Sequence, residues 1–156
     1  RDVPAFKQIG PIYRQLGLAV SPDHCSLALR GLQTLALRLE QLEKSTLQVA
    51  HWLADHHKIQ AVFHPALASC PGHDVWKRDF TGSTSVFSIW FTDDVSPTQV
   101  EAVIDSLELF QIGLSWGGIN SLAIVYPDVE RPGQDYAGRL VRLNLSKLER
   151  ILYCLC

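Results

Sequence analysis

The chain has 156 residues, of which 47% are hydrophobic and 19% charged, and its formal net charge is −2. This length and apolar content suit one domain with a sizeable core, predicted as residues 1–156, and exclude an intrinsically disordered chain. The weak net charge offers no basic field for nucleic acid or an anionic membrane, and no apolar run approaches the ~20 residues that cross a bilayer. We therefore expect neither nucleic acid nor membrane as a partner.

Helical spacing dominates the N-terminal part of the chain. Residues 3–18 predict a helix that Gly10-Pro11 should break or kink. Ser21 followed by Pro22 predicts an N-cap with proline at the first helical position. Apolar residues at helical spacing from 31 to 56 then predict one long amphipathic helix.

Strand patterns follow this helix. Ser96-Pro97 begins a helix that runs to about residue 109, and a final helix is expected from about Ser146. Helices first, then strands with one helix between them, predict an α+β fold, a small and mostly antiparallel sheet with helices on one face. The pairing order does not follow from the pattern. Short strands are predicted at residues 59–64, 86–91, 111–114, 122–126 and 140–145.

The cysteines bear on the cellular compartment of the protein, and the absence of methionine bears on whether the chain is part of a longer polypeptide. Cys25, Cys70, Cys154 and Cys156 are even in number, but a chain with this much apolar content needs no disulfides. We therefore expect reduced thiols in a cytoplasmic protein. The sequence has no methionine, and apolar residues still recur at helical spacing in its last residues, so we expect a piece of a longer polypeptide.

Neither the histidines nor the serine-containing turns predict a metal or nucleophile site. Cys70-x-x-His73 and Cys154-x-Cys156 have poor spacing for zinc, and no metal is expected. The histidines near residues 51–57 suit a helix C-terminus, where the dipole tolerates positive charge. The turns at 81–84 and 115–118 lack the Gly-x-Ser-x-Gly of a nucleophile elbow and indicate turn chemistry.

One combination of residues suits a carboxylate. The turn Ser115-Trp116-Gly117-Gly118 lies between two predicted strands, and Arg142 lies inside a later apolar strand, where an arginine is costly unless an anion or partner pairs with it. The arginine would bind a carboxylate through two hydrogen bonds, with the serine turn beside it. Alternatively, Arg142 points to a solvated sheet face and extends its head into water. The pattern leaves both interpretations open.

These residues also carry a resemblance to a known family. The chain resembles the bacterial cystathionine β-lyases, which belong to the Cys/Met-metabolism enzymes that use pyridoxal 5′-phosphate (PLP). It departs from them at Leu114, where they often have Tyr, and at Ile119-Asn120, where Tyr-Glu is usual. The resemblance spans about residues 15–148, and its blocks are Arg30-Gly31-Leu32-Gln33-Thr34-Leu35 with Arg38, His64-Pro65-Ala66-Leu67, Cys70-Pro71-Gly72-His73-Asp74-Val75-Trp76-Lys77-Arg78-Asp79-Phe80-Thr81-Gly82-Ser83, and Ser115-Trp116-Gly117-Gly118 with Ser121-Leu122.

The resemblance implies the C-terminal small domain of a fold-type I enzyme, with the N-terminal arm and the large PLP-binding domain outside this chain. In the family a lysine in a Ser-x-Thr-Lys context carries PLP, and no lysine here has that context. We therefore expect no Schiff-base lysine, no bound cofactor and no activity in this chain alone. Ser115 and Arg142 match the positions that hold the substrate α-carboxylate, and Trp116 matches the aromatic residue that lines the substrate pocket.

For the complete enzyme, the resemblance implies a PLP-dependent lyase that converts cystathionine to homocysteine, pyruvate and ammonia, a transsulfuration step of methionine biosynthesis. The expected partners are the amino-acid substrate, the chain's own large domain and the other subunits of a homotetramer. Two alternatives remain. One is a fragment of a γ-acting relative, cystathionine γ-synthase or γ-lyase, against which Trp116 argues. The other is a free-standing, non-catalytic binding domain.

Overall fold

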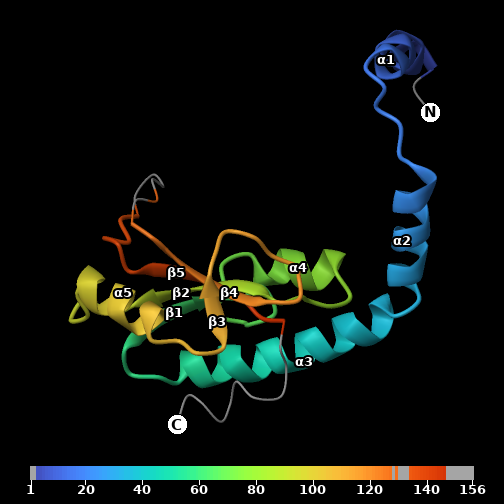
Figure 1. Cartoon of the computed structure of the whole chain (residues 1–156). Helices are drawn as coiled ribbons and strands as arrows, with labels where there is room; N and C mark the ends of the chain where they lie inside the picture. The colour runs from blue at the N-terminus through green and yellow to red at the C-terminus, as the bar shows by residue number, and fades with distance from the viewer. Residues whose placement is uncertain (1–2, 128, 130–133, 147–156) are drawn as a thin grey trace. The chain divides into compact units, whose positions relative to one another are not determined.

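The computed structural model describes residues 3–127, 129 and 134–146 (Figure 1). Contacts between residues divide the chain into two compact units, residues 1–37 and 38–156, and each unit is described by itself. The sequence-based expectation of one domain over residues 1–156 stays a prediction. The final helix predicted from about Ser146 falls almost entirely outside the described residues.

The first unit contains helices α1 (Val3–Gln15) and α2 (Pro22–Leu32). Helix α1 continues through Gly10 and Pro11, so the expected break does not occur there, and the expected kink stays a prediction. The predicted cap of α2 is confirmed, because the Ser21 side chain accepts a hydrogen bond from the His24 N–H at 3.2 Å and Pro22 follows it.

Helix α3 (Leu35–Ala54) lies almost wholly in the second unit. The prediction of one helix from 31 to 56 was wrong at its start, since a turn at residues 33–34 separates α2 from α3. Gln33 itself has helical torsion angles, φ −59° and ψ −29°, so hydrophobic periodicity carries across the turn and does not reveal it. The buried face of α3 includes Val49, Ala50 and Leu53.

The second unit is built on a five-stranded sheet with the order β1-β2-β5-β4-β3. The three pairings among β1, β2, β5 and β4 are antiparallel, and only the edge pair β3–β4 is parallel, so the predicted mostly antiparallel sheet is confirmed. The strands are β1 (Ile59–Phe63), β2 (Val86–Phe91), β3 (Phe110–Ile112), β4 (Ser121–Tyr126) and β5 (Leu140–Asn144).

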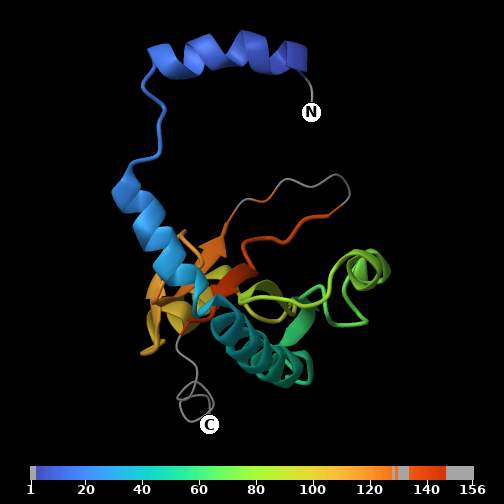
Figure 2. The same cartoon turned by 90° about the vertical axis from the view of Figure 1, so that its right-hand side faces the viewer.

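Helices α3 and α5 (Pro97–Asp105) cover one face of this sheet, as the sequence predicts (Figure 1). A capping box formed by Ser96 and Gln99 fixes the start of α5. The core between the helices and the sheet buries alternate strand residues, among them Phe87, Ile89, Ala123, Val141 and Leu143, together with Val100 and Ile104 of α5. Helix α4 (His73–Asp79), which the sequence did not predict, lies to one side of the sheet (Figures 1 and 2).

The opposite face of the sheet carries the other alternate residues. Arg142 and Asn144 of β5 point there, because Val141 and Leu143 between and before them face the core. Tyr136 covers part of this face and contacts the rings of Phe63 and Trp90 edge-on, with centroid distances of 6.1 and 5.2 Å. Within the described ranges, none of the helices is long and apolar enough to cross a membrane.

Candidate functional site

Arg142 is half-buried in the middle of β5, opposite Ser88 of β2 and Ile124 of β4. Its guanidinium carbon lies 5.8 Å from the centroid of the Tyr126 ring, within the range of a cation–π contact. Its Nη2 donates hydrogen bonds to the backbone carbonyl of Leu114 and, at 3.4 Å, to that of Ser115. The guanidinium is therefore held between an aromatic ring and the serine turn instead of extending freely into water.

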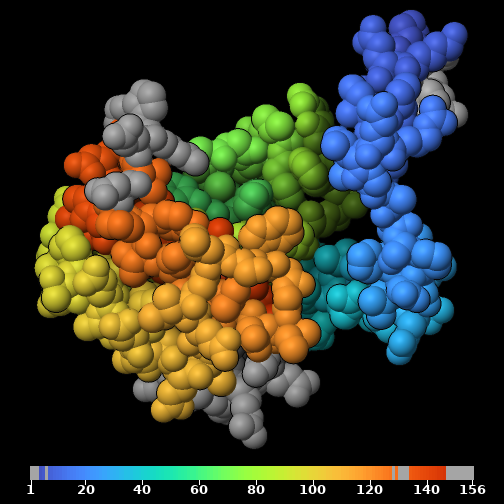
Figure 3. Space-filling view, turned by 45° about the horizontal axis from the view of Figure 1, so that its top comes forward, coloured from blue at the N-terminus to red at the C-terminus, as the bar shows by residue number. Residues whose placement is uncertain are grey.

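The serine turn belongs to the loop of residues 113–120, which connects the parallel strands β3 and β4. Parallel neighbours usually need a connection of a dozen or more residues, so this short loop has to double back beside the sheet. Gly117 has φ +73°, a left-handed conformation that glycine adopts without strain and that turns the chain sharply. Figure 3 shows the orange loop and β4 next to the red residues of β5.

The loop brings the predicted residues together through its backbone. Ser115 and Trp116 are exposed, and Trp116 retains 67% of its surface accessibility. The contact between Ser115 and Arg142 runs through the Ser115 carbonyl, which accepts from Arg142. Trp116 exposes its indole one residue along the chain from the Ser115 carbonyl that accepts from Arg142. An indole offers a stacking surface, and a guanidinium offers a fork of hydrogen-bond donors.

The sequence did not lead us to predict a role for Asn144, which is 1% exposed. Its side-chain oxygen accepts from the Ser85 hydroxyl at 2.9 Å and from the Gly117 N–H at 3.4 Å, and its amide nitrogen donates to the Asn120 carbonyl at 3.4 Å. Asn144 thus ties the loop to β5 two residues beyond Arg142. A signal was present in the sequence, since an asparagine between Leu143 and Leu145 in an apolar strand is costly to bury unless its amide is hydrogen-bonded.

The long block of resemblance at residues 64–83 folds into a structural network around the core. His64 is 1% exposed, its Nδ1 accepts from the Ala66 N–H at 3.2 Å, and its ring packs edge-on against Phe87. Burial lowers the pKa of His64 below its ordinary value, and a hydrogen bond to the backbone of Thr84 opposes this effect. The carboxylate of Glu43 on α3 accepts from the Ser83 N–H and hydroxyl at 2.7 and 2.9 Å. Both contacts fix the segment that enters β2.

The cysteine and histidine pair at 70 and 73 makes local contacts. His73 Nδ1 lies 2.8 Å from the Pro65 carbonyl, and its ring lies 5.6 Å from that of Trp76. Burial raises the pKa of the Cys70 thiol, so the thiolate is disfavoured there. Among the described residues, no three His, Cys, Asp or Glu side chains are placed to share a metal ion, while Cys154 and Cys156 lie outside the described part of the chain.

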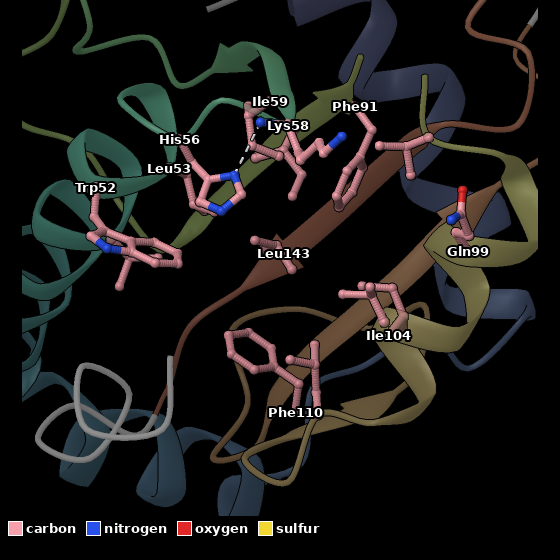
Figure 4. A pocket seen from close by; sticks show the side chains of 15 residues that line it. Trp52, Leu53, His56, Lys58, Ile59, Phe91, Gln99, Ile104, Phe110 and Leu143 are labelled. Carbon is pink, nitrogen blue, oxygen red and sulfur yellow. Dashed lines mark hydrogen bonds between the residues drawn. The ribbon is translucent and has the colours of Figure 1, made fainter. Parts of the chain in front are cut away.

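A concave feature lies on the helical side of the sheet. A cavity of about 390 Å³ opens between α3, α5 and the strands, and Figure 4 shows Trp52 and Leu53 on one side of it, Ile104 and Phe110 on the other and Leu143 at its floor. Its lining is almost entirely apolar. At its rim His56 Nδ1 accepts from the Lys58 N–H at 3.2 Å, and the Lys58 ammonium pairs with Asp94. The apolar groove therefore lies on the face away from Arg142 and lacks convergent polar groups.

The family model of the Cys/Met metabolism PLP-dependent enzymes matches residues 3–134 of the chain. The chain is 39% identical over 137 residues to the cystathionine β-lyase of Salmonella typhimurium, and 35% identical over 144 residues to the L-alanine/L-glutamate racemase of Wolbachia pipientis wMel. These alignments cover 84% and 88% of this chain and 35% of each relative. The chain thus spans about a third of the length of these curated relatives.

Solved structures agree with this match. A cystathionine γ-synthase from Xanthomonas oryzae pv. oryzae, solved in complex with aminoacrylate and cysteine, has a TM-score of 0.76 and 28% identity with this chain. The superposition covers 94% of this chain and 39% of that one. Nearly all of the chain therefore corresponds to one part of a larger enzyme fold.

Proposed function

Because the chain belongs to the Cys/Met metabolism PLP-dependent enzyme family, we propose that it is the C-terminal, substrate-side domain of a carbon–sulfur lyase that acts on cystathionine. The observation that carries the proposal is the placement of Arg142 against the carbonyls of Leu114 and Ser115, with Trp116 exposed on the same turn. In this proposal the complete enzyme is cytoplasmic, and the chain alone is catalytically inert.

The proposed task of this domain is to fix the α-carboxylate of the substrate. A guanidinium offers two parallel N–H groups that match the two oxygens of a carboxylate, and Tyr126 beneath it limits its motion. Holding the carboxylate at one end and the substrate's side chain against Trp116 at the other orients the bonds at the Cα carbon. This is a positioning role, which raises the rate without any proton transfer by Arg142.

The described lysines of this chain do not match the lysine that carries PLP in the family. Lys58 pairs with Asp94 at the end of β2, and Lys7, Lys44 and Lys77 lie on three different helices, none in the Ser-x-Thr-Lys context of the family. We therefore assign PLP to the large domain of the complete enzyme, outside this chain. That large domain and further subunits of a homo-oligomer, a tetramer in the family, are its proposed protein partners.

A γ-acting enzyme is the second candidate, and the similarity to a cystathionine γ-synthase structure supports it. A carboxylate clamp serves either reaction, and it serves the racemisation named for the Wolbachia relative equally well. Trp116 favours the β-lyase, because the turn resembles that of the bacterial β-lyases, in which an aromatic residue at this position lines the substrate pocket. Cleavage at the γ-carbon of cystathionine gives cysteine and 2-oxobutyrate, whereas cleavage at the β-carbon gives homocysteine and pyruvate, so the products separate a β-lyase from a γ-lyase.

The mass of the native polypeptide tests the assignment to a larger enzyme. Detection in cell extract with an antibody raised against this chain should give a band well above its 17.4 kDa, about two and a half times larger if the native chain matches the length of the Salmonella relative. A native band at 17.4 kDa would instead favour a free-standing, non-catalytic domain.

A further inference from the structure

We propose that Asn144 is a positioning residue that holds the Ser115–Gly118 turn in the arrangement in which Arg142 can bind a carboxylate. The inference rests on the proposed function, since it concerns the same carboxylate site. It adds a residue that lies behind the turn, is 1% exposed and has no access to the substrate.

The contacts of Asn144 determine the orientation of its amide. A backbone N–H only donates and a backbone carbonyl only accepts, so the Gly117 N–H requires the side-chain oxygen and the Asn120 carbonyl requires the side-chain nitrogen. The Ser85 hydroxyl, 2.9 Å from the same oxygen, agrees with this orientation. Ser85 is itself 3% exposed, and its carbonyl accepts from the Leu145 N–H at 3.1 Å. The amide therefore has a fixed support behind it.

Two side chains of one strand face hold the loop at different points. Arg142 contacts the carbonyls of residues 114 and 115, where the loop leaves β3. Asn144 lies roughly 7 Å further along β5, at about 3.3 Å of strand per residue, and contacts residues 117 and 120. With only Arg142 in place, the loop would be anchored by the same guanidinium that has to bind the substrate.

This arrangement predicts a consequence for the Arg142 site. When a carboxylate takes donors of Arg142, the contacts to the loop carbonyls compete with it. Asn144 keeps the turn in place during that exchange, because its contacts do not involve the guanidinium. Loss of the Asn144 contacts should leave the turn free to move, so that the arginine and the exposed Trp116 no longer present one preformed site.

The test uses the complete enzyme with two near-isosteric variants and a matched control. Asn144→Leu removes every polar contact, and Asn144→Asp replaces the donor to Asn120 with a carboxylate oxygen that repels its carbonyl. Thr46→Val is the control, because Thr46 is a fully buried polar residue on α3 whose hydroxyl has no hydrogen-bond partner among the described residues. Inhibition constants are measured for L-alanine and for L-alaninamide, which differ only in the carboxylate.

The expected result is a loss of carboxylate recognition. Wild type and Thr46→Val should bind L-alanine at least about tenfold more tightly than L-alaninamide, which is ~1.4 kcal/mol. Both Asn144 variants should reduce that ratio to about threefold or less, raise KM for cystathionine more than they lower kcat, and increase amide hydrogen exchange in a peptide covering residues 113–120. If either Asn144 variant fails to fold, Ser85→Ala, which removes the support of the amide, should shift the same ratio in the same direction.

Two outcomes would overturn the inference, and they differ in whether they also refute the proposed carboxylate site. If wild type prefers L-alanine while a folded Asn144 variant keeps the full ratio and the wild-type exchange, Asn144 does not position the turn, and the proposed carboxylate site stands. If wild type itself does not distinguish the two compounds, the carboxylate site and this inference fail together.

Discussion

Replacement of Arg142 by lysine in the complete enzyme removes the planar fork and keeps the positive charge. In the structure Nη2 reaches the Leu114 and Ser115 carbonyls while the guanidinium lies over Tyr126. A lysine ammonium is a point charge that cannot bind both carboxylate oxygens in parallel and stack on the ring at the same time.

The size of the effect follows from the burial of the site. Loss of one partner of a fully buried charge pair costs about 2–5 kcal/mol, and Arg142 is only half-buried, so the lower part of that range applies. Arg142→Lys should therefore lower kcat/KM for cystathionine by at least about tenfold, ~1.4 kcal/mol, and Arg142→Ala by about thirtyfold or more, ~2 kcal/mol.

The assay is steady-state kinetics with L-cystathionine, with PLP content and Tm measured on the same preparations. Both quantities should stay near wild type, because the cofactor is assigned to the large domain and Arg142 lies outside the hydrophobic core. Full activity of Arg142→Ala towards cystathionine would refute the reasoning. It would mean that Arg142 is a surface side chain, and Ser115 would lose its main support as part of a carboxylate site.

Three further predictions concern the chain itself. After incubation with PLP and borohydride reduction, mass spectrometry should find no stoichiometric pyridoxyl adduct on a single lysine, and one such adduct would contradict the assignment of PLP to the large domain. The isolated chain should self-associate in sedimentation experiments, with mass rising above 17.4 kDa, because α1 and α2 expose Ile9, Ile12, Leu27 and Leu29; a monomer at every concentration would speak for an autonomous domain. Burial lowers the folded-state pKa of His64 below 6.5, so the unfolded state binds more protons just below that pH, and Tm should fall as the pH is lowered from about 6.5. In His64→Asn, Tm should fall less steeply with decreasing pH than in wild type. An unchanged slope of Tm against pH would mean that other groups cause the fall.

Much of the fold follows from local patterns in the sequence. The cap at Ser21, the helix that begins at Ser96 and the five strands depend on side chains close to one another in the chain, and local signals suffice for them. The turn at Gln33 was missed because its torsion angles are helical, and α4 was missed because a short, exposed helix has no apolar face to reveal it.

Only part of the candidate site could be predicted from the sequence. Arg142 could be predicted as a site residue because burying a charge in an apolar strand costs free energy. The Ser115 turn could be predicted from its glycines. The contacts that join them depend on a parallel edge pair, β3–β4, that brings residues 113–120 back along the sheet, and hydrophobic periodicity does not determine which strands are neighbours. Asn144 is also a polar residue in an apolar strand, a weaker signal than a charged arginine, and its role depends on contacts with Ser85, Gly117 and Asn120, which are distant along the chain.

The most direct test of the central claim is to identify the products that the complete enzyme forms from L-cystathionine. Purified, PLP-loaded enzyme is incubated with the substrate, and the keto acid and the thiol amino acid are identified by mass spectrometry. The proposal predicts pyruvate and homocysteine in equal amounts, at a rate that Arg142→Lys reduces at least about tenfold. Formation of 2-oxobutyrate and cysteine, or no turnover by fully loaded enzyme, would contradict it.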